Sequence, residues 1–198
     1  MLYTEEMKMN KTKVFGIAVL AAVLIIVIIA LLFMKYNSKK SINAVAQNIT
    51  IGSVAPNYDF IIGNGSIVNL SAYRGHPVVL WFVATWCSSC AQGNEAINQN
   101  YRFFEQHGIK IIELELYKDL GYSGPPITGF IDSYAPSAYS NGVLIPALAG
   151  YNMTTAYDPK AYLDIYYLIS KNGTVLYING SPELTLGQLE KAINSTGN

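Results

Sequence analysis

Cys87 and Cys90 are the only cysteines of the chain, and they lie where a predicted strand meets a predicted helix. The apolar run 78–83 precedes them, and residues 91–107 after them have helical spacing of apolar side chains. The N-terminus of a helix favours a thiolate at the first cysteine of such a pair. The second cysteine, one turn later, can attack a mixed disulfide within the same molecule. The motif therefore predicts a redox-active Cys87–Cys90 disulfide.

Two other interpretations of the cysteine pair are weaker. A structural disulfide that closes so short a loop removes little chain entropy. Half of a zinc site needs two more Cys or His ligands, and the only histidines, His76 and His107, show no ligand spacing. The sequence therefore predicts no metal ligand and no cofactor.

Composition limits the classes of protein and partner. With 198 residues, the chain can hold one ordinary domain plus extra segments. Its 13 basic and 13 acidic residues balance to a formal net charge of zero, and no basic cluster indicates a nucleic acid partner.

One segment is long and apolar enough to predict a membrane anchor. Residues 14–34 form a run without a charged residue, and this run is long enough for a helix to cross a lipid bilayer. No small-x-small cleavage site follows, so we expect an uncleaved single-pass signal anchor. Residues 1–13 are then a short cytoplasmic tail, residues 35–47 a polar tether, and residues 48–198 an extracytoplasmic domain of a cell-membrane protein.

Asn-x-Ser/Thr sequons beyond this segment are more frequent than chance predicts, which favours an external and glycosylated domain. The alternative is a sequence that is simply rich in Asn, Ser and Thr. The candidate acceptors are Asn48, Asn64, Asn69, Asn152, Asn172, Asn179 and Asn194.

The remaining pattern predicts an α/β domain. Asn64-Gly65 between two apolar runs indicates a β-hairpin, and residues 111–116 and 166–170 indicate further strands. Residues 175–178 pair with the latter after a turn. A last helix has capping-box spacing at Thr185 and Gln188, with Leu189 and Ile193 on one face. For residues 118–160 we expect mostly irregular packing, with a short helix near 128–134, although a lid or partner surface is an alternative.

Four segments resemble the membrane-anchored TlpA/ResA-like thioredoxin family. The opening segment 51–60 reads IGSVAPNYDF, and the hairpin 64–71 reads NGSIVNLS. Residues 73–87 read YRGHPVVLWFVATWC, and the late strand and turn 169–173 read ISKNG. Peroxiredoxins share the opening segment but place Thr or Ser three residues before the reactive cysteine, where this chain has Ala84.

The resemblance implies a thioredoxin-like fold, with a central mixed sheet flanked by helices and an N-terminal hairpin extension. It implies an extracytoplasmic thiol–disulfide oxidoreductase that acts on protein disulfides, apocytochrome c among them, and exchanges electrons with a membrane donor or acceptor. Cys87 would be the exposed attacking thiol and Cys90 the buried resolving one. Trp86 would line the substrate side, unless it is ordinary packing.

Three departures from the family pattern bear on the site. Ser89 replaces the usual Pro within the motif. Ser88 and Ser89 would donate hydrogen bonds to the thiolate or merely begin the helix. The position of the family's cis-proline falls at Asp164 or Ile165, and a trans or shifted loop is expected because cis non-proline bonds are costly. An Asp facing the thiols would disfavour the Cys87 thiolate.

The third departure concerns the buried acid. The two positions where relatives often carry a carboxylate behind the buried cysteine correspond to Trp81 and Gly93, and neither is acidic. Glu95 is near in sequence but is expected to point elsewhere. Proton transfer would then use water or an acid that the sequence does not identify.

Two competing functions remain open. The first is a redox-idle binding protein that docks a partner through residues 118–160. The second is copper delivery, because some thioredoxin-like proteins bind copper through two cysteines and a histidine. Their cysteine spacing is wider, and neither His76 nor His107 is well placed for that role.

Overall fold

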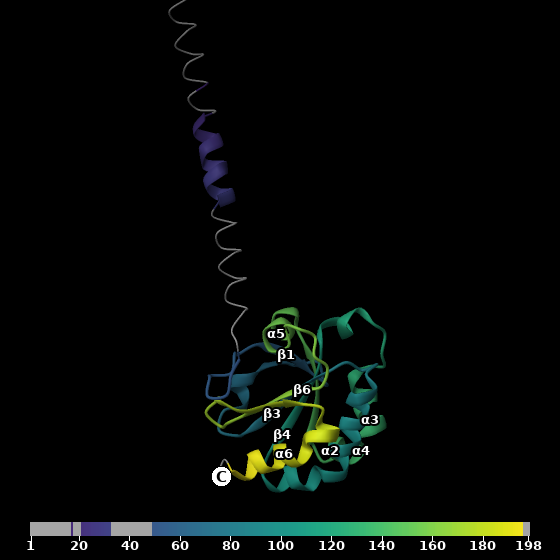
Figure 1. The fold of residues 1–198 in the computed structure, drawn as a ribbon. Helices are drawn as coiled ribbons and strands as arrows, with labels where there is room; N and C mark the ends of the chain where they lie inside the picture. Colours follow the sequence, from purple (N-terminus) through teal and green to yellow (C-terminus); the bar gives the residue numbers. More distant parts are fainter. Residues whose placement is uncertain (1–16, 18–20, 33–48, 196–198) are drawn as a thin grey trace, which may run out of the picture. The chain divides into compact units, whose positions relative to one another are not determined.

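The computed structural model describes residue 17, residues 21–32 and residues 49–195 (Figure 1). Residues 21–32 are helical. Among the described residues, no helix has both the length and the apolarity required to cross a membrane. The predicted tail 1–13, tether 35–47 and acceptor Asn48 lie outside the described residues, as does much of the predicted anchor 14–34.

A seven-stranded mixed sheet forms the centre of the domain, in the order β2-β1-β5-β4-β3-β6-β7. The strands β3, β4 and β5 run parallel to one another, and the other neighbouring pairs are antiparallel. The strands are β1 Asp59–Ile62, β2 Ile67–Asn69, β3 Val78–Val83, β4 Lys110–Glu115, β5 Leu144–Ala149, β6 Ile165–Ile169 and β7 Val175–Gly180.

Helices cover both faces of this sheet (Figure 1). One face packs against α2 Ser88–Gln106, α3 Ile127–Tyr134, α4 Pro136–Ser140 and α6 Pro182–Ser195, and the other face packs against α5 Tyr151–Tyr157. Short 3-10 turns complete the domain at η1 Leu70–Tyr73 and η2 Tyr117–Gly121.

The central strand β3 is buried along its whole length because both of its faces are covered. Val79, Trp81 and Val83 face the core that α2 and α6 close. The alternate residues of β3 face the second core, on the α5 side. This buried strand ends just before the cysteine motif and thereby fixes where α2 begins.

The predicted hairpin, the strand 78–83 and the short helix near 128–134 are confirmed. The expectation of irregular packing over residues 118–160 is wrong, because β5 lies there as an inner strand between β1 and β4. Pro146 lies in the middle of β5. Proline has no N–H group to donate within a sheet, so its presence argues against an inner strand. Its carbonyl accepts a hydrogen bond from the Gly63 N–H at 2.9 Å, so the proline still takes part in backbone pairing.

The predicted capping box at the last helix is also wrong. The helix α6 begins at Pro182, so Thr185 lies inside its first turn. The Thr185 hydroxyl donates to the carbonyl of Gly180 at 2.8 Å and contacts the Tyr166 hydroxyl at 2.7 Å. Leu189 and Ile193 share one face of the helix as predicted, and both are buried in the same core.

Candidate active site

The two cysteines form a disulfide at the N-terminus of α2. Cys87 is the N-cap residue, and its Sγ accepts a hydrogen bond from the backbone N–H of Cys90 at 3.2 Å. Cys87 keeps 5% of its surface exposed and Cys90 none. A partner can therefore approach Cys87 first, and in the reduced form the same N–H group would stabilise a Cys87 thiolate.

The residues beside the cysteines differ in their exposure and in their contact with Cys87 Sγ. The hydroxyl of Ser89 lies 3.1 Å from Cys87 Sγ, within hydrogen-bonding distance, whereas Ser88 is exposed. Trp86 is 38% exposed directly before the disulfide, and its ring lies 4.8 Å from that of Tyr122, which is also exposed. Together Trp86 and Tyr122 form an aromatic pair at the rim of the site.

The segment 117–124 is hydrogen-bonded to Thr85, the residue directly before Trp86. The buried Asp119 carboxylate accepts hydrogen bonds from Thr85, and its backbone carbonyl accepts one from the Trp86 indole N–H at 2.8 Å. Lys118, Asp119 and Leu120 all adopt left-handed backbone angles, with φ between 51° and 58°. Since such angles are strained for residues other than glycine, the Asp119 contacts must help to hold the turn.

Asp164 faces the disulfide from the segment before β6. Its Oδ2 lies 4.0 Å from Cys87 Sγ, and the residue is 1% exposed. Burial raises the pKa of the Asp164 carboxyl to about 6, although hydrogen bonding from Ser89 lowers it. No described residue has a cis peptide bond, and Asp164 instead adopts a left-handed φ of 69°. Ile165, the other candidate, is the half-buried first residue of β6.

Trp81 packs against Gly93, and these are the two positions at which the resemblance implies a carboxylate in relatives. A Cβ atom at Gly93 would lie 2.7 Å from Cζ2 of the Trp81 ring, so a side chain at position 93 needs a smaller residue at position 81. The indole and the glycine are therefore complementary. The contact explains on steric grounds why position 93 carries no carboxylate while Trp occupies position 81.

A buried acid is nevertheless present, one strand away from Trp81. Glu113 of β4 is paired in register with Trp81 of β3 and is fully buried. The Asn94 side chain donates to Glu113 Oε1 at 2.8 Å and to the backbone carbonyl of Cys90 at 3.3 Å. Burial, with a smaller contribution from the charge of Asp164, raises the pKa of Glu113 to about 8, although the hydrogen bond from Asn94 lowers it. Glu113 is therefore mostly protonated at neutral pH, while Asp164 is mostly ionised.

Sequence reasoning missed both Glu113 and Asp119. A signal for Glu113 was available, because strand alternation places it on the same face as Ile111, which packs in the core beneath α2. Asp119 gave no comparable signal, since its partner Thr85 lies 34 positions away. Glu95 is exposed on α2, as expected.

Comparisons with known proteins agree with this geometry. Residues 51–119 match the AhpC/TSA family model. The thiol-disulfide oxidoreductase ResA of Bacillus subtilis (strain 168) is 28% identical over 158 residues, which cover 79% of this chain and 80% of the relative. ResA of Geobacillus kaustophilus (strain HTA426) is 31% identical over 68 residues, or 34% of this chain and 39% of that one.

Solved structures show the same fold. A protein from Chlorobium tepidum described as a thiol:disulfide interchange protein DsbE aligns with a TM-score of 0.56 and 22% identity, over 74% of this chain and 99% of its own. The thioredoxin domain of a thiol-disulfide oxidoreductase from Bacteroides vulgatus aligns with a TM-score of 0.54 and 17% identity, over 74% and 100%. The chain resembles the ResA-like thioredoxins. It is a thiol–disulfide oxidoreductase.

The predicted glycan acceptors of this ResA-like chain differ in exposure. Asn69 and Asn179 are half-buried, and the Asn179 side chain donates to Tyr177 and Gln188. Glycosylation of these residues stays a prediction. The exposed acceptors are Asn64, Asn152, Asn172 and Asn194.

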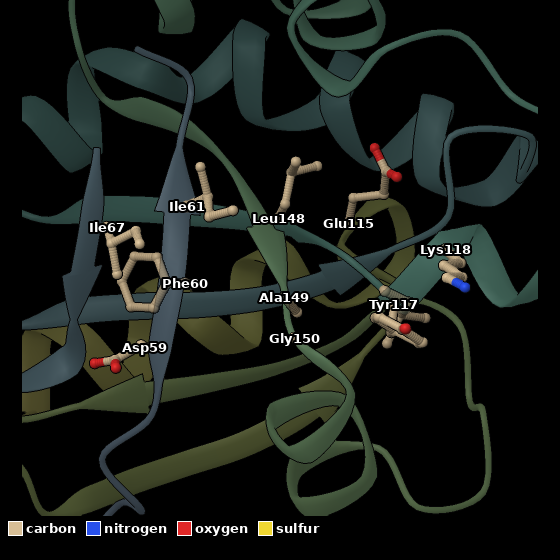
Figure 2. A pocket seen from close by; sticks show the side chains of 11 residues that line it. Asp59, Phe60, Ile61, Ile67, Glu115, Tyr117, Lys118, Leu148, Ala149 and Gly150 are labelled. Carbon is tan, nitrogen blue, oxygen red and sulfur yellow. The ribbon is translucent and has the colours of Figure 1, made fainter. Parts of the chain in front are cut away.

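A separate groove of about 530 Å³ is lined by residues of β1, β2, β4 and β5 and by the segment 116–118. Figure 2 shows Ile61, Leu148 and Glu115 projecting from three strands, with Tyr117 and Lys118 at the far end. Burial raises the pKa of Glu115 to about 7, with a further contribution from the Asp119 charge. Neither cysteine lines this groove.

Proposed function

We propose that the chain is a membrane-anchored enzyme that exchanges disulfides with protein substrates on the extracytoplasmic side. The observation that carries the exchange chemistry is the Cys87–Cys90 disulfide at the N-terminus of α2, where 5% of Cys87 and none of Cys90 is exposed. The anchor rests on the charge-free run 14–34, and the external location is supported by the excess of sequons beyond it.

The proposed reaction moves two electrons from the dithiol to the substrate. The Cys87 thiolate attacks one sulfur of the substrate disulfide, which forms a mixed disulfide and releases one substrate thiolate. Cys90 then loses its proton and attacks Cys87 Sγ, which forms the Cys87–Cys90 bond and releases the second substrate thiolate. A membrane electron donor returns two electrons to the pair. With a membrane acceptor, the same steps run in reverse.

The surroundings of the pair supply what these steps need. The helix N-terminus stabilises negative charge on Cys87 Sγ, and the Ser89 hydroxyl can donate its single proton either to this atom or to the Asp164 carboxylate. The exposed Trp86–Tyr122 pair offers an apolar surface to the residues that flank a substrate disulfide. Glu113, linked to the Cys90 backbone through Asn94, can take the Cys90 proton in its ionised form, which is the minority form at neutral pH because burial raises its pKa to about 8.

Full-length protein with single cysteine substitutions tests the exchange. Cys87→Ser should abolish reduction of a protein disulfide such as insulin, and Cys90→Ser should trap a mixed disulfide through Cys87 that appears as a reducible mass increase. Activity of Cys87→Ser at the wild-type rate would contradict the proposal. Because the resemblance implies apocytochrome c, that protein is the first physiological class of substrate to assay.

Location is tested separately from chemistry. In cells that express the full chain, a membrane-impermeant maleimide should label reduced Cys87 without lysis, and the protein should remain in the membrane fraction after an alkaline wash. Labelling that needs lysis would place the domain on the opposite side and would leave the exchange chemistry unaffected.

A further inference from the structure

Three side chains that can bind a metal converge at the disulfide. The Sγ atoms of Cys87 and Cys90 and a carboxylate oxygen of Asp164 all lie within 4.8 Å of one another. Cys87 and Cys90 come from the start of α2, and Asp164 comes from the segment before β6. All three residues are buried, with exposed fractions of 5%, 0% and 1%.

The Asp164 carboxylate supplies a second, independent observation. Its Oδ1 accepts no hydrogen bond of ordinary geometry among the described residues, although the residue is almost completely buried, and the compensation by Ser89 and the Trp81 indole, which lowers the pKa of the carboxyl, is only partial. An unpaired carboxylate oxygen is costly in such a place unless a cation or a donor compensates it.

The backbone holds Asp164 in this position. Its N–H donates to the carbonyl of Phe82 at 3.1 Å, and its own carbonyl accepts a hydrogen bond from the Ser181 N–H at 3.1 Å. The left-handed φ of 69° is a conformation that Asp tolerates better than most residues. The carboxylate is therefore fixed toward the sulfur atoms by its neighbours in β3 and β7–α6.

We propose that Cys87, Cys90 and Asp164 of the reduced protein bind one Zn²⁺ ion. Two thiolates and one carboxylate are a ligand set that zinc accepts, with bonds of about 2.3 Å to sulfur and about 2.0–2.2 Å to oxygen. Soft sulfur ligands disfavour Ca²⁺ and Mg²⁺. The histidines do not enter this site. His107 contacts Phe103 and Asn194 at the far end of α2, and His76 is exposed.

Binding needs no electron transfer. The two thiols release two protons to solvent, the ion forms two bonds to sulfur and one to oxygen, and a fourth position stays open for water or another ligand. The disulfide form offers no thiolate and cannot complete the site. Bound metal would occupy both sulfur atoms and block exchange reversibly. This last consequence rests on the proposed function, whereas the binding itself does not.

Titration of the full-length protein with Cd²⁺, a spectroscopic substitute for Zn²⁺, tests the site. The reduced protein should bind one ion per chain with a thiolate-to-cadmium absorption band, and the oxidised protein should show none. Asp164→Asn should keep the band and lower the affinity by at least about tenfold. Asp158→Asn is the matched control, because Asp158 is also buried with an unpaired carboxylate oxygen, and its affinity should equal that of the wild type.

Several results would overturn the metal site. Equal affinities of wild type and Asp164→Asn would show that the dithiol alone binds, and an equal band in the oxidised protein would exclude the cysteines. If Asp164→Asn fails to fold, Asp164→Glu serves instead, because its longer side chain should displace the oxygen and also weaken binding. Insulin reduction without metal binding would refute only this inference, whereas metal binding without reduction would refute only the proposed function.

Discussion

Asp119 holds Thr85 through two hydrogen bonds, one to the backbone N–H and one to the hydroxyl, each 2.8 Å long. This contact joins the turn after β4 to the residue two positions before Cys87. Gly124 packs against Thr85 as well, since a Cβ atom added at Gly124 would lie 2.0 Å from the Thr85 hydroxyl oxygen. The aromatic rim of the site therefore depends on a turn that lies far away in the sequence.

We expect Asp119→Asn to loosen this rim. The amide can replace only one of the two accepted hydrogen bonds, so the free energy of unfolding should fall by about 1–3 kcal/mol. The value of kcat/KM should fall more for a protein disulfide than for a small disulfide, because the proposed docking on Trp86 and Tyr122 needs the residues that flank the disulfide of a protein. Assays with insulin and with a small aromatic disulfide measure the two values. The exposed Asp132→Asn is the control, and an equal loss for both substrates would argue against a docking role.

Glu113 should make stability depend on pH in a defined direction. Its pKa is raised to about 8 in the folded state, so the folded protein binds a proton that the unfolded chain releases above about pH 4.5. The stabilisation is complete below that lower pKa and is lost as the pH rises through 8. The free energy of unfolding should therefore fall by about 1 kcal/mol or slightly less between pH 7 and 8 from this group.

Glu113→Gln should flatten this dependence, as measured by urea unfolding at pH 7 and 8. Glu113 should contribute most of the change in this interval, because the pKa values of Asp158 and Asp164 are raised only to about 6, while Glu115, with a pKa raised to about 7, contributes a smaller part. Glu95→Gln, an exposed change on α2, should keep the wild-type slope. An unchanged slope in Glu113→Gln would mean that this carboxyl is ionised in the folded protein.

Asp164 should oppose the thiolate of Cys87. Above about pH 6 the carboxylate is ionised, and at 4.0 Å from Cys87 Sγ it disfavours a second negative charge. Asp164→Asn should therefore lower the pKa of Cys87 by on the order of one unit. The rate of alkylation against pH, measured with a chelator present, gives this pKa. An unchanged or raised value would reject the effect, and Asp158→Asn again serves as the control.

A side chain at position 93 should be poorly tolerated. Gly93→Ala places Cβ against the ring of Trp81, so we expect a loss of about 1–3 kcal/mol in the free energy of unfolding. Gly187→Ala in α6 is the control, because its Cβ would meet no atom within 4 Å. Adding Trp81→Phe to Gly93→Ala should recover part of the loss. No recovery in the double variant would show that the indole is not the obstacle.

The hairpin β1–β2 and the strand β3 could be predicted because residues close together in the sequence determine them. The hairpin β1–β2 follows from Asn64-Gly65, and the boundaries of β3 follow from an uninterrupted apolar run. The strand β5 was not predicted because Pro146 interrupts a segment rich in Ala and Gly. Its position in the sheet is determined by pairing with β1 and β4. Tertiary pairing decided the structure there.

The site divides in the same way. Cys87, Cys90 and Trp86 are adjacent in sequence, so the motif alone placed them. Asp164 was placed by counting back from Gly173 within the resemblance, and the structure brings it to the disulfide. Glu113 and Asp119 become part of the site only through contacts across 19 and 34 positions, to Asn94 and Thr85. No local spacing encodes such contacts.

The fit of Trp81 against Gly93 also limits how this sequence can change over time. An acid at position 93 would collide with the indole, and a smaller residue at position 81 alone would leave a void behind the disulfide. Each single step is therefore penalised, and the double change should be penalised less, because the smaller residue at position 81 removes the collision. Among relatives of this chain, the identities at these two positions should covary, with Trp permitted only where Gly faces it.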